Sequence, residues 1–575
     1  MSDTHWIVEG RIDERWPINT RGNIGEVFPE VLTPLSYELG VVPAEAGWRD
    51  AYEVMGIMRK DDFSTTEPVI IGLYGGYGYL NLSYLRMMGV RAPGSSAEAI
   101  DVSFFGEGNP PPYEPRKGDK SLGSSLKILR TVMSALGQSD LPDIVAESNE
   151  IVARYESRQP ALDAADDVII RYLREFPTSF RPAFRNHLIS TSTAAIVAGI
   201  LGDACAAAGN PGLVTHLIGA SGDVKSAEYA NELWTIAQHV RGSESLRATF
   251  DGGVDGLLGR LGSDDDSVAF KEQFDAFVDR HGHRGPNDWE LSSRTWENTP
   301  ELALTAIDRM RLAETDLSTS QRLGDDQAKR DAAIAEVRPH LKFMDKMNFD
   351  KAVDAVGVWS QAREATRDRA VRCSLSFKRL YREMVRRAAE RGGDPDPLGV
   401  AMLRPSDEWA GYFDDPASYR EAINERMALR DRFAAVEPPF FIEGQAEVPS
   451  IEELEANAAE STVSVGVGDT LSGDAGSSGV AQGRVRVVMD PADATDLEPG
   501  EVLVAPLTDP AWTPLFLPAA AVVVNVGAFM SHAVIVSREL GIPCVVAVEG
   551  ATSALQDGML VEVDGTAGTV KVLEG

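Results

Sequence analysis

A stretch of small and acidic residues between positions 441 and 476 divides the chain into two unequal parts. Most of it reads EVPSIEELEANAAESTVSVGVGDTLSGDAG, with almost no aromatic side chains, a composition typical of a flexible linker. A chain of 575 residues is also too long for a single hydrophobic core. We therefore predict a domain at 1–440, a linker at 441–476 and a second domain at 477–575.

The larger part changes character near residue 120. Before that point turn formers alternate with short apolar runs, which favours strands and loops. From about 120 to 435 apolar residues recur at three- and four-residue spacing, as in SLKILRTVMSALG and STAAIVAGILGDACAAAG, and this spacing predicts amphipathic helices. The longest and most basic helix is expected at 368–391, ending before Gly392 and Gly393.

The smaller part consists of short valine-rich runs with one helical segment, SHAVIVSREL, between them. The runs are GRVRVV, EVLVAP, AAVVVN, CVVAVE, MLVEVD and TVKVL. This pattern predicts a compact α/β domain. The fold class is therefore a multidomain α+β protein, in which a large, mostly helical region precedes a small α/β domain.

The charge balance excludes some classes of partner. The chain has 55 Lys and Arg against 88 Asp and Glu, a formal charge of −33, which repels nucleic acid and anionic membrane surfaces. No leader pattern opens the sequence, and no long uninterrupted apolar run follows. The three cysteines are isolated from one another, so we expect no disulfide framework and no metal site. A cytoplasmic protein fits these features.

The segment from Asn525 to Val546 carries the clearest chemical signal. A buried strand runs into a turn at Gly527, after which Ser531 is placed to cap a helix that begins at His532 and ends before Gly541. An imidazole is a nucleophile near neutral pH, and a helix N-terminus stabilises a bound phosphoryl dianion. His532 is thus a candidate carrier of a phosphoryl group. The alternative is a histidine that only caps or packs at a helix start.

Residues 477–575 resemble the mobile phosphohistidine domain of the phosphoenolpyruvate-utilising enzymes, a group that includes rifampin phosphotransferase. The matching residues are Ser531, His532, Ala533, Arg538, Glu539, Gly541, Ile542 and Pro543, with TDPAWTPLF upstream and DGMLVEVDGTAGTV downstream. Val526 and the three residues 528–530 depart from the family pattern. The resemblance implies a swivelling domain in which His532 carries the phosphoryl group, supported by Ser531 and Arg538.

The N-terminal region resembles, over shorter segments, the substrate-binding region of rifampin phosphotransferase and the phosphohistidine subunit of phenylphosphate (aryl or cresol phosphate) synthase. The segments are RGNIGEVFPEVLTPLSYEL, GYLNLSYL and HGHRGPNDWELSSRTWENTP. From this resemblance Arg21 and Glu26 are expected to bind the acceptor substrate. A purely structural loop is the alternative for both.

The third of these segments places His281, His283 and Arg284 close together in sequence. We expect Arg284 to steady a transferring phosphoryl group, while His281 or His283 takes the proton of the acceptor hydroxyl. Arg363 and Arg367 lie four residues apart on one helical face and are candidates for a phosphate clamp. The alternatives are a hydrogen-bonded loop that pins helices together, and surface salt bridges for the arginine pair.

Neither an ATP-grasp domain, nor a C-terminal phosphoenolpyruvate barrel, nor a Walker motif is recognisable in the sequence. By analogy with phenylphosphate synthase, we expect a separate ATP-grasp subunit to hold ATP and Mg²⁺ and to charge His532, giving AMP and inorganic phosphate. The chain would form a hetero-oligomer with that subunit.

The acceptor is expected to be a small hydroxylated compound, such as a phenol or a cresol. This expectation rests on the aromatic side chains Tyr74, Tyr77, Tyr79, Tyr84, Trp289 and Trp296. Three alternatives remain: an antibiotic acceptor, a phosphohistidine carrier or regulator whose recipient is another protein, and a homologue that binds a ligand without turnover.

Overall fold

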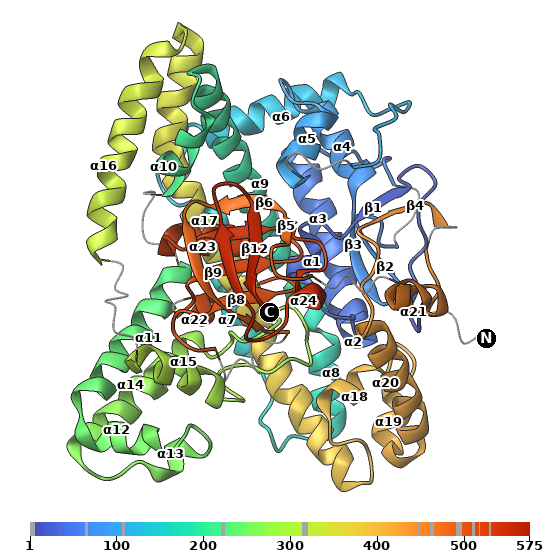
Figure 1. The fold of residues 1–575 in the computed structure, drawn as a ribbon. Coiled ribbons are helices and arrows are strands. Elements are labelled where there is room, and N and C mark those ends of the chain that lie inside the picture. The colour runs from blue at the N-terminus through green and yellow to red at the C-terminus, as the bar shows by residue number, and fades with distance from the viewer. Residues whose placement is uncertain are drawn as a thin grey trace.

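The structure is a computed structural model. It describes residues 6–63, 67–105, 110–219, 225–312, 320–445, 448–460, 465–489, 497–508, 512–516, 518–527 and 531–575. These residues form a four-stranded sheet, a large set of helices and an eight-stranded sheet. The mixture agrees with the predicted α+β class. Figure 1 shows the C-terminal sheet, coloured orange to red, in the centre of the view with helices of the N-terminal region on either side.

The smaller sheet is antiparallel and has the strand order β2-β3-β1-β4. Its strands are β1 (Ile18–Thr20), β2 (Ile71–Tyr74), β3 (Tyr77–Asn81) and β4 (Phe441–Glu443). Gly75 and Gly76 form the tight turn between β2 and β3, and both have positive φ, 55° and 76°, as a two-residue hairpin loop requires.

Several helices surround this sheet within the first 120 residues, where the sequence predicted strands and loops. They are α1 (Ile24–Val27), α2 (Pro34–Ser36), the π-helix η1 (Tyr37–Val41), α3 (Val42–Met55), α4 (Leu82–Arg91) and α5 (Ala97–Phe105). Pro43 lies in the first turn of α3, where proline is tolerated. Asn81 caps α4 by accepting a hydrogen bond from the Tyr84 N–H at 2.9 Å. The prediction was wrong here because proline and asparagine were interpreted as turn formers rather than helix starts.

The predicted helical region is helical. It comprises α6 (Leu122–Ala135), α7 (Asp143–Glu156), α8 (Asp166–Arg174), α9 (Phe176–Ala207), η2 (Pro211–Leu213), α10 (Val214–Gly219), α11 (Lys225–Gly242), α12 (Glu244–Asp251), α13 (Leu257–Arg260), α14 (Asp265–His281), α15 (Glu301–Leu312), α16 (Ser320–Val337), η3 (Arg338–His340), α17 (Phe343–Glu390), α18 (Pro397–Ala401), α19 (Trp409–Asp414), η4 (Pro416–Tyr419) and α20 (Arg420–Ala434).

Two long helices, α9 and α17, pack along each other through the middle of this region. The helix predicted at 368–391 is the second half of α17, which begins earlier, at Phe343. Its end agrees with the prediction, because Gly392 has φ 88° just beyond the helix. The helical stretch Asp166–Ala207 is long and apolar enough to cross a membrane by composition alone. It packs against α17 and α3, as a core helix does.

The C-terminal sheet has the order β5-β12-β11-β7-β8-β9-β10-β6, with β7, β8, β9 and β10 parallel. The strands are β5 (Thr470–Ser472), β6 (Asp474–Ser477), β7 (Val480–Val487), β8 (Val502–Ala505), β9 (Ala521–Val524), β10 (Cys544–Val546), β11 (Leu560–Asp564) and β12 (Thr569–Glu574). One hydrophobic cluster joins the sheet to α22 (Thr513–Phe516) and α23 (His532–Leu540), and a second joins it to α24 (Ala551–Ala554).

The segment 441–476, expected to be a flexible linker, differs in the structure. β4 pairs with β1 in the N-terminal sheet, whereas β5 and β6 belong to the C-terminal sheet. Between them, α21 (Ile451–Glu460) buries Ile451 and Leu454 in the N-terminal core. Composition concealed this because two apolar residues three positions apart are enough to anchor a short acidic helix.

Candidate active site

His532 is the first residue of α23 and follows β9, at the carboxyl end of the parallel strands, where ligands of such sheets bind. The helix ends at Gly541, which has φ 69°, as predicted. Ser531 occupies the N-cap position with an extended backbone but makes no capping hydrogen bond. Its buried hydroxyl has no hydrogen-bond partner among the described residues.

Two neighbours fix the His532 ring. Nδ1 lies 3.1 Å from Oγ1 of Thr508, just beyond the end of β8, and the ring of Phe516 stands edge-on at 5.8 Å. Because Thr508 contacts the Nδ1 edge, we expect a phosphoryl group to bond to Nε2. Thr508 was not predicted as a site residue, although it lies in the TDPAWTPLF segment that carried the resemblance.

The C-terminal domain docks its histidine against the N-terminal region. The His532 backbone N–H donates to Oε2 of Glu26 on α1 at 3.3 Å, and α22 contacts α15. Burial, together with the positive charges of Arg367 and Arg284, lowers the pKa of His532 to about 3, so the docked imidazole is neutral. His532 nevertheless stays only half-buried. Residues from both parts of the chain therefore form one site.

Glu26 and Arg21 were both expected to bind substrate, but in the structure they have different partners: Glu26 contacts His532, whereas Arg21 contacts backbone oxygens. Burial raises the pKa of Glu26 to about 8, opposed by the hydrogen bond from His532. Arg21 instead donates to the backbone oxygens of Gly78, Phe28 and Pro29 at 2.6, 3.1 and 3.3 Å. Arg21 thus holds the chain on either side of α1, and its guanidinium is engaged by backbone.

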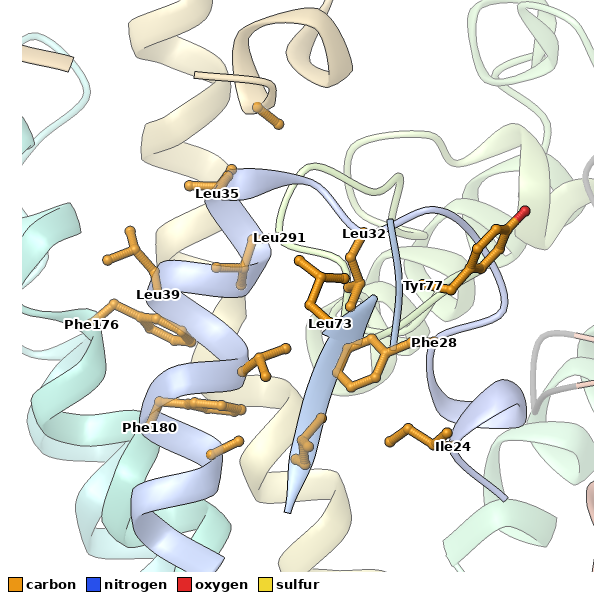
Figure 2. Close-up of a cluster of buried hydrophobic side chains, with 14 of the residues drawn as sticks. Ile24, Phe28, Leu32, Leu35, Leu39, Leu73, Tyr77, Phe176, Phe180 and Leu291 are labelled. Atoms are coloured by element: carbon orange, nitrogen blue, oxygen red, sulfur yellow. The ribbon is translucent and has the colours of Figure 1, made fainter. Parts of the chain in front are cut away.

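The hydrophobic core behind α1 keeps this helix in place. Ile24 and Phe28 lie against Leu73 and Leu32, and Leu35 and Leu39 continue the cluster towards Phe176 and Phe180 of α9 (Figure 2). Leu291 belongs to the same cluster. The core therefore connects the Glu26 segment with the loop that carries the second predicted set of site residues.

That loop follows α14, which ends at His281. The two predicted histidines, His281 and His283, have different partners. His281 lies 3.2 Å from Glu232 on α11 and packs against Phe277, so it belongs to helix packing. His283 is fully buried, with Nε2 2.8 Å from Oδ1 of Asp368 and with Nδ1 unpartnered among the described residues. Burial lowers the pKa of His283 against the opposing charge of Asp368.

Arg284 and Arg367 are brought together by one carboxylate. Both have Nη2 near Oδ2 of Asp288, at 3.3 and 3.4 Å. Burial alone would lower the pKa of Arg284, but Asp288 and nearby acidic groups raise it. The positive charges of Arg284 and Arg367 both lower the pKa of His532, whereas the role of Arg284 in steadying a phosphoryl group stays a prediction. Asp288 lies in the same sequence segment and was not predicted as a site residue.

Arg363 and Arg367 have different partners, and the phosphate clamp expected of them stays a prediction. Arg363 pairs with its neighbour Glu364 at 2.9 Å. Arg367 instead lies over the ring of Trp289, 6.0 Å from its centroid. Trp289 stacks on His187 of α9, so a half-buried aromatic wall stands beside Arg367.

Two other sets of predicted site residues have structural contacts. Arg538 lies near the end of α23, at the opposite end from His532, and donates to the Gly476 oxygen at 2.8 Å, which connects α23 to β6. The aromatic residues expected to hold the acceptor are mostly core residues; Tyr74, Tyr77, Tyr79, Tyr84 and Trp296 are all buried in hydrophobic clusters. Among the described residues no group of His, Cys, Asp and Glu is arranged to hold a metal ion.

Two family models match parts of the chain. Residues 497–568 match the mobile domain of PEP-utilising enzymes, and residues 183–364 match the fourth domain of rifampicin phosphotransferase. Both models describe domains of phosphoenolpyruvate-utilising enzymes, to which these two regions are similar. The first match contains His532, and the second contains Arg284 and ends three residues before Arg367. The two matched regions thus contribute to the one site.

The chain matches individual relatives over only part of their length. An uncharacterised protein of Mycobacterium tuberculosis is 35% identical over 51% of this chain and 30% of its own. The prodigiosin synthesizing transferase PigC of Serratia marcescens is 26% identical over 99% of this chain and 64% of its own. A rifampicin phosphotransferase of Streptomyces is 29% identical over 61% and 40%. The chain therefore spans less than two thirds of each of these relatives.

Proposed function

We propose that the chain transfers a phosphoryl group from Nε2 of His532 to the hydroxyl group of a small acceptor bound beside Arg284 and Arg367. The observation that carries this proposal is the docked position of His532, with its N–H on Glu26 and under the charge of both arginines. A transferring phosphoryl group needs positioning and neutralisation of its charge more than new covalent chemistry. Two arginines held by Asp288 and a helix N-terminus supply both.

The donor in this proposal is an ATP-grasp unit that binds ATP and Mg²⁺ and places the β-phosphoryl group of ATP on His532, releasing AMP and inorganic phosphate. The assignment follows from the family's use of nucleotide donors. By the same analogy with phenylphosphate synthase, Mg²⁺ is assigned to the donor together with ATP. The mobile domain would then carry the group from that donor to the docked position.

The acceptor is proposed to be a phenol or cresol, on the support of the Trp289 and His187 wall beside Arg367. An antibiotic acceptor is the second candidate, favoured by the match of residues 183–364 to a rifampicin phosphotransferase domain. A carrier that delivers the group to another protein is less consistent with the charges of Arg284 and Arg367, which lower the pKa of His532 from within this chain.

A screen for AMP release tests the proposal. The chain, a candidate ATP-grasp subunit, ATP and Mg²⁺ are incubated with phenol, p-cresol, simple alcohols or rifampicin. We expect one class to raise AMP release and to be recovered as a phosphate ester, and His532→Ala to abolish both. Labelling of a protein recipient in place of any ester would support the carrier function instead.

A further inference from the structure

The transfer must remove one proton from the acceptor hydroxyl, and the histidines expected to do so are poorly placed. His281 is engaged with Glu232 and packed against Phe277. His283 keeps one ring nitrogen without a partner among the described residues, but its side chain is 0% exposed in the docked form. Both rings are buried and engaged within the helical region, which favours a proton acceptor elsewhere.

Glu26 is placed differently, because it touches the helix end that carries the reacting imidazole. Its Oε2 lies 3.3 Å from the backbone nitrogen of His532, and the residue is only partly buried. We infer that the Glu26 carboxylate accepts the proton of the acceptor hydroxyl, an inference that rests on the proposed function. In this assignment the loop histidines have structural roles.

The backbone presents Glu26 in a costly conformation. Asn23 has φ 65° and ψ −49°, and the Ile24 N–H donates to the Gly22 oxygen at 2.8 Å, which closes a three-residue turn. This γ-turn geometry is rare and strained. The hydrogen bonds of Arg21 to Phe28, Pro29 and Gly78 hold the turn and α1 in place. This strained turn lowers the stability of the fold, but it fixes the position of α1, whose Glu26 side chain contacts His532.

The proton affinity of Glu26 follows the movement of the domain. With the mobile domain away, we expect solvent to reach the carboxyl and its pKa to return towards the usual 4.5. Docking buries the carboxyl and raises its pKa to about 8. In the docked form the ionised fraction of Glu26 is therefore a stronger base than an exposed carboxylate, and this fraction grows as the pH rises to about 8; the accepted proton is released when the domain leaves.

The atoms of the step balance. The acceptor oxygen forms a bond to phosphorus, and its proton moves to the Glu26 carboxylate. The bond between phosphorus and Nε2 breaks, and its electron pair stays on Nε2. In the tautomer with the hydrogen on Nδ1, which the 3.1 Å contact with Thr508 allows, His532 leaves as a neutral imidazole.

The test bypasses the unknown donor. The full 575-residue chain is phosphorylated with potassium phosphoramidate, a small chemical donor to histidine. Loss of phosphohistidine is then followed by ³¹P NMR with phenol or water as the acceptor. Glu26→Gln is isosteric, and its amide oxygen still accepts the His532 N–H. Glu30→Gln is the matched control, since Glu30 lies on the same segment and pairs with Arg430 at the surface.

We expect Glu26→Gln to take up as much phosphoryl group as the wild type but to lose it about 100-fold or more slowly. Glu26→Asp should recover part of the rate, and Glu30→Gln should match the wild type. The wild-type rate should rise with pH up to about pH 8, as Glu26 ionises, and this rise should disappear in Glu26→Gln. Equal rates in Glu26→Gln and wild type would overturn the inference alone. If wild-type His532 takes up no phosphoryl group, the proposed function fails and the inference fails with it.

Discussion

Thr508 Oγ1 lies 3.1 Å from Nδ1 of His532. This contact joins the ends of the neighbouring parallel strands β8 and β9, so the sheet itself sets the orientation of the imidazole. If Thr508 accepts the Nδ1 hydrogen in this contact, Nε2 is the nucleophile, because the two ring nitrogens exchange roles with the tautomer.

Thr508→Val keeps the shape of the side chain and removes the hydroxyl, so it should lower the rate of His532 phosphorylation. The loss of one buried hydrogen bond of about 1 kcal/mol corresponds to roughly fivefold. ³¹P NMR of the phosphoramidate-treated protein should also show a mixture of Nε2 and Nδ1 phosphohistidine. Thr508→Ser, which keeps the hydroxyl, should give the Nε2 product alone; an unchanged product in Thr508→Val would remove the orienting role.

Arg367→Gln should slow phosphoryl transfer by about 100-fold or more, since it removes one of the two cations that act on His532. It should also raise the pKa of docked His532, which ¹H–¹⁵N NMR of the imidazole can measure. Arg363→Gln is the control from one helical turn earlier, where the side chain pairs with Glu364. Equal losses in both variants would mean that the helix, rather than the Arg367 charge, matters.

Docking of the mobile domain should depend on pH with a flat maximum. His532 has a usual pKa of 6.5 and a docked pKa of about 3, whereas Glu26 goes from 4.5 to about 8. Between pH 4.5 and 6.5 the docked form gains the Glu26 proton and lacks the His532 proton, so the two effects cancel.

Above pH 6.5 only the Glu26 proton distinguishes the two forms, so docking should weaken roughly tenfold per pH unit until about pH 8. Below pH 4.5 docking should weaken as the pH falls, because the open form binds the His532 proton. Fluorescence energy transfer between the two domains measures this. Glu26→Gln should abolish the alkaline decline, and a decline that persists in this variant would assign it to another group.

Arg21→Lys should destabilise the N-terminal region by about 1–3 kcal/mol, because a lysine cannot replace the forked contacts to Gly78, Phe28 and Pro29. Urea unfolding gives the free energy. The same variant should also slow transfer, since Glu26 depends on this segment for its position. Wild-type stability in Arg21→Lys would show that these backbone oxygens are satisfied without the guanidinium.

Local patterns predicted the mobile domain well. The strand before His532, the helix start and the Gly541 end depend on residues adjacent in sequence, where capping and turn rules apply. The helices from α6 onwards follow from apolar spacing for the same reason. The first 120 residues were harder, because Pro43 and Asn81 start helices whose stability comes from distant packing.

The site was predictable only in part, because its contacts join distant segments. His532 meets Glu26 across 506 positions, and His283 meets Asp368 across 85. Residue type alone gave three candidates at the end of α14 and in the loop after it, yet the fold places His281 in helix packing and pairs Arg284 with Asp288. Tyr77 and Tyr79 were expected to hold the acceptor but lie in the core. All five residues of their strand, β3, are buried, which the residue types along the strand did not reveal.

Phosphorylation of His532 is the central claim, and detection of the modified residue tests it most directly. The full chain is incubated with ATP, Mg²⁺ and a candidate ATP-grasp subunit, and then analysed by mass spectrometry and by stability to acid and alkali. We predict one acid-labile, alkali-stable phosphoryl group on His532, absent from His532→Ala. A phosphoryl group on another residue, or equal labelling of His532→Ala, would contradict the account.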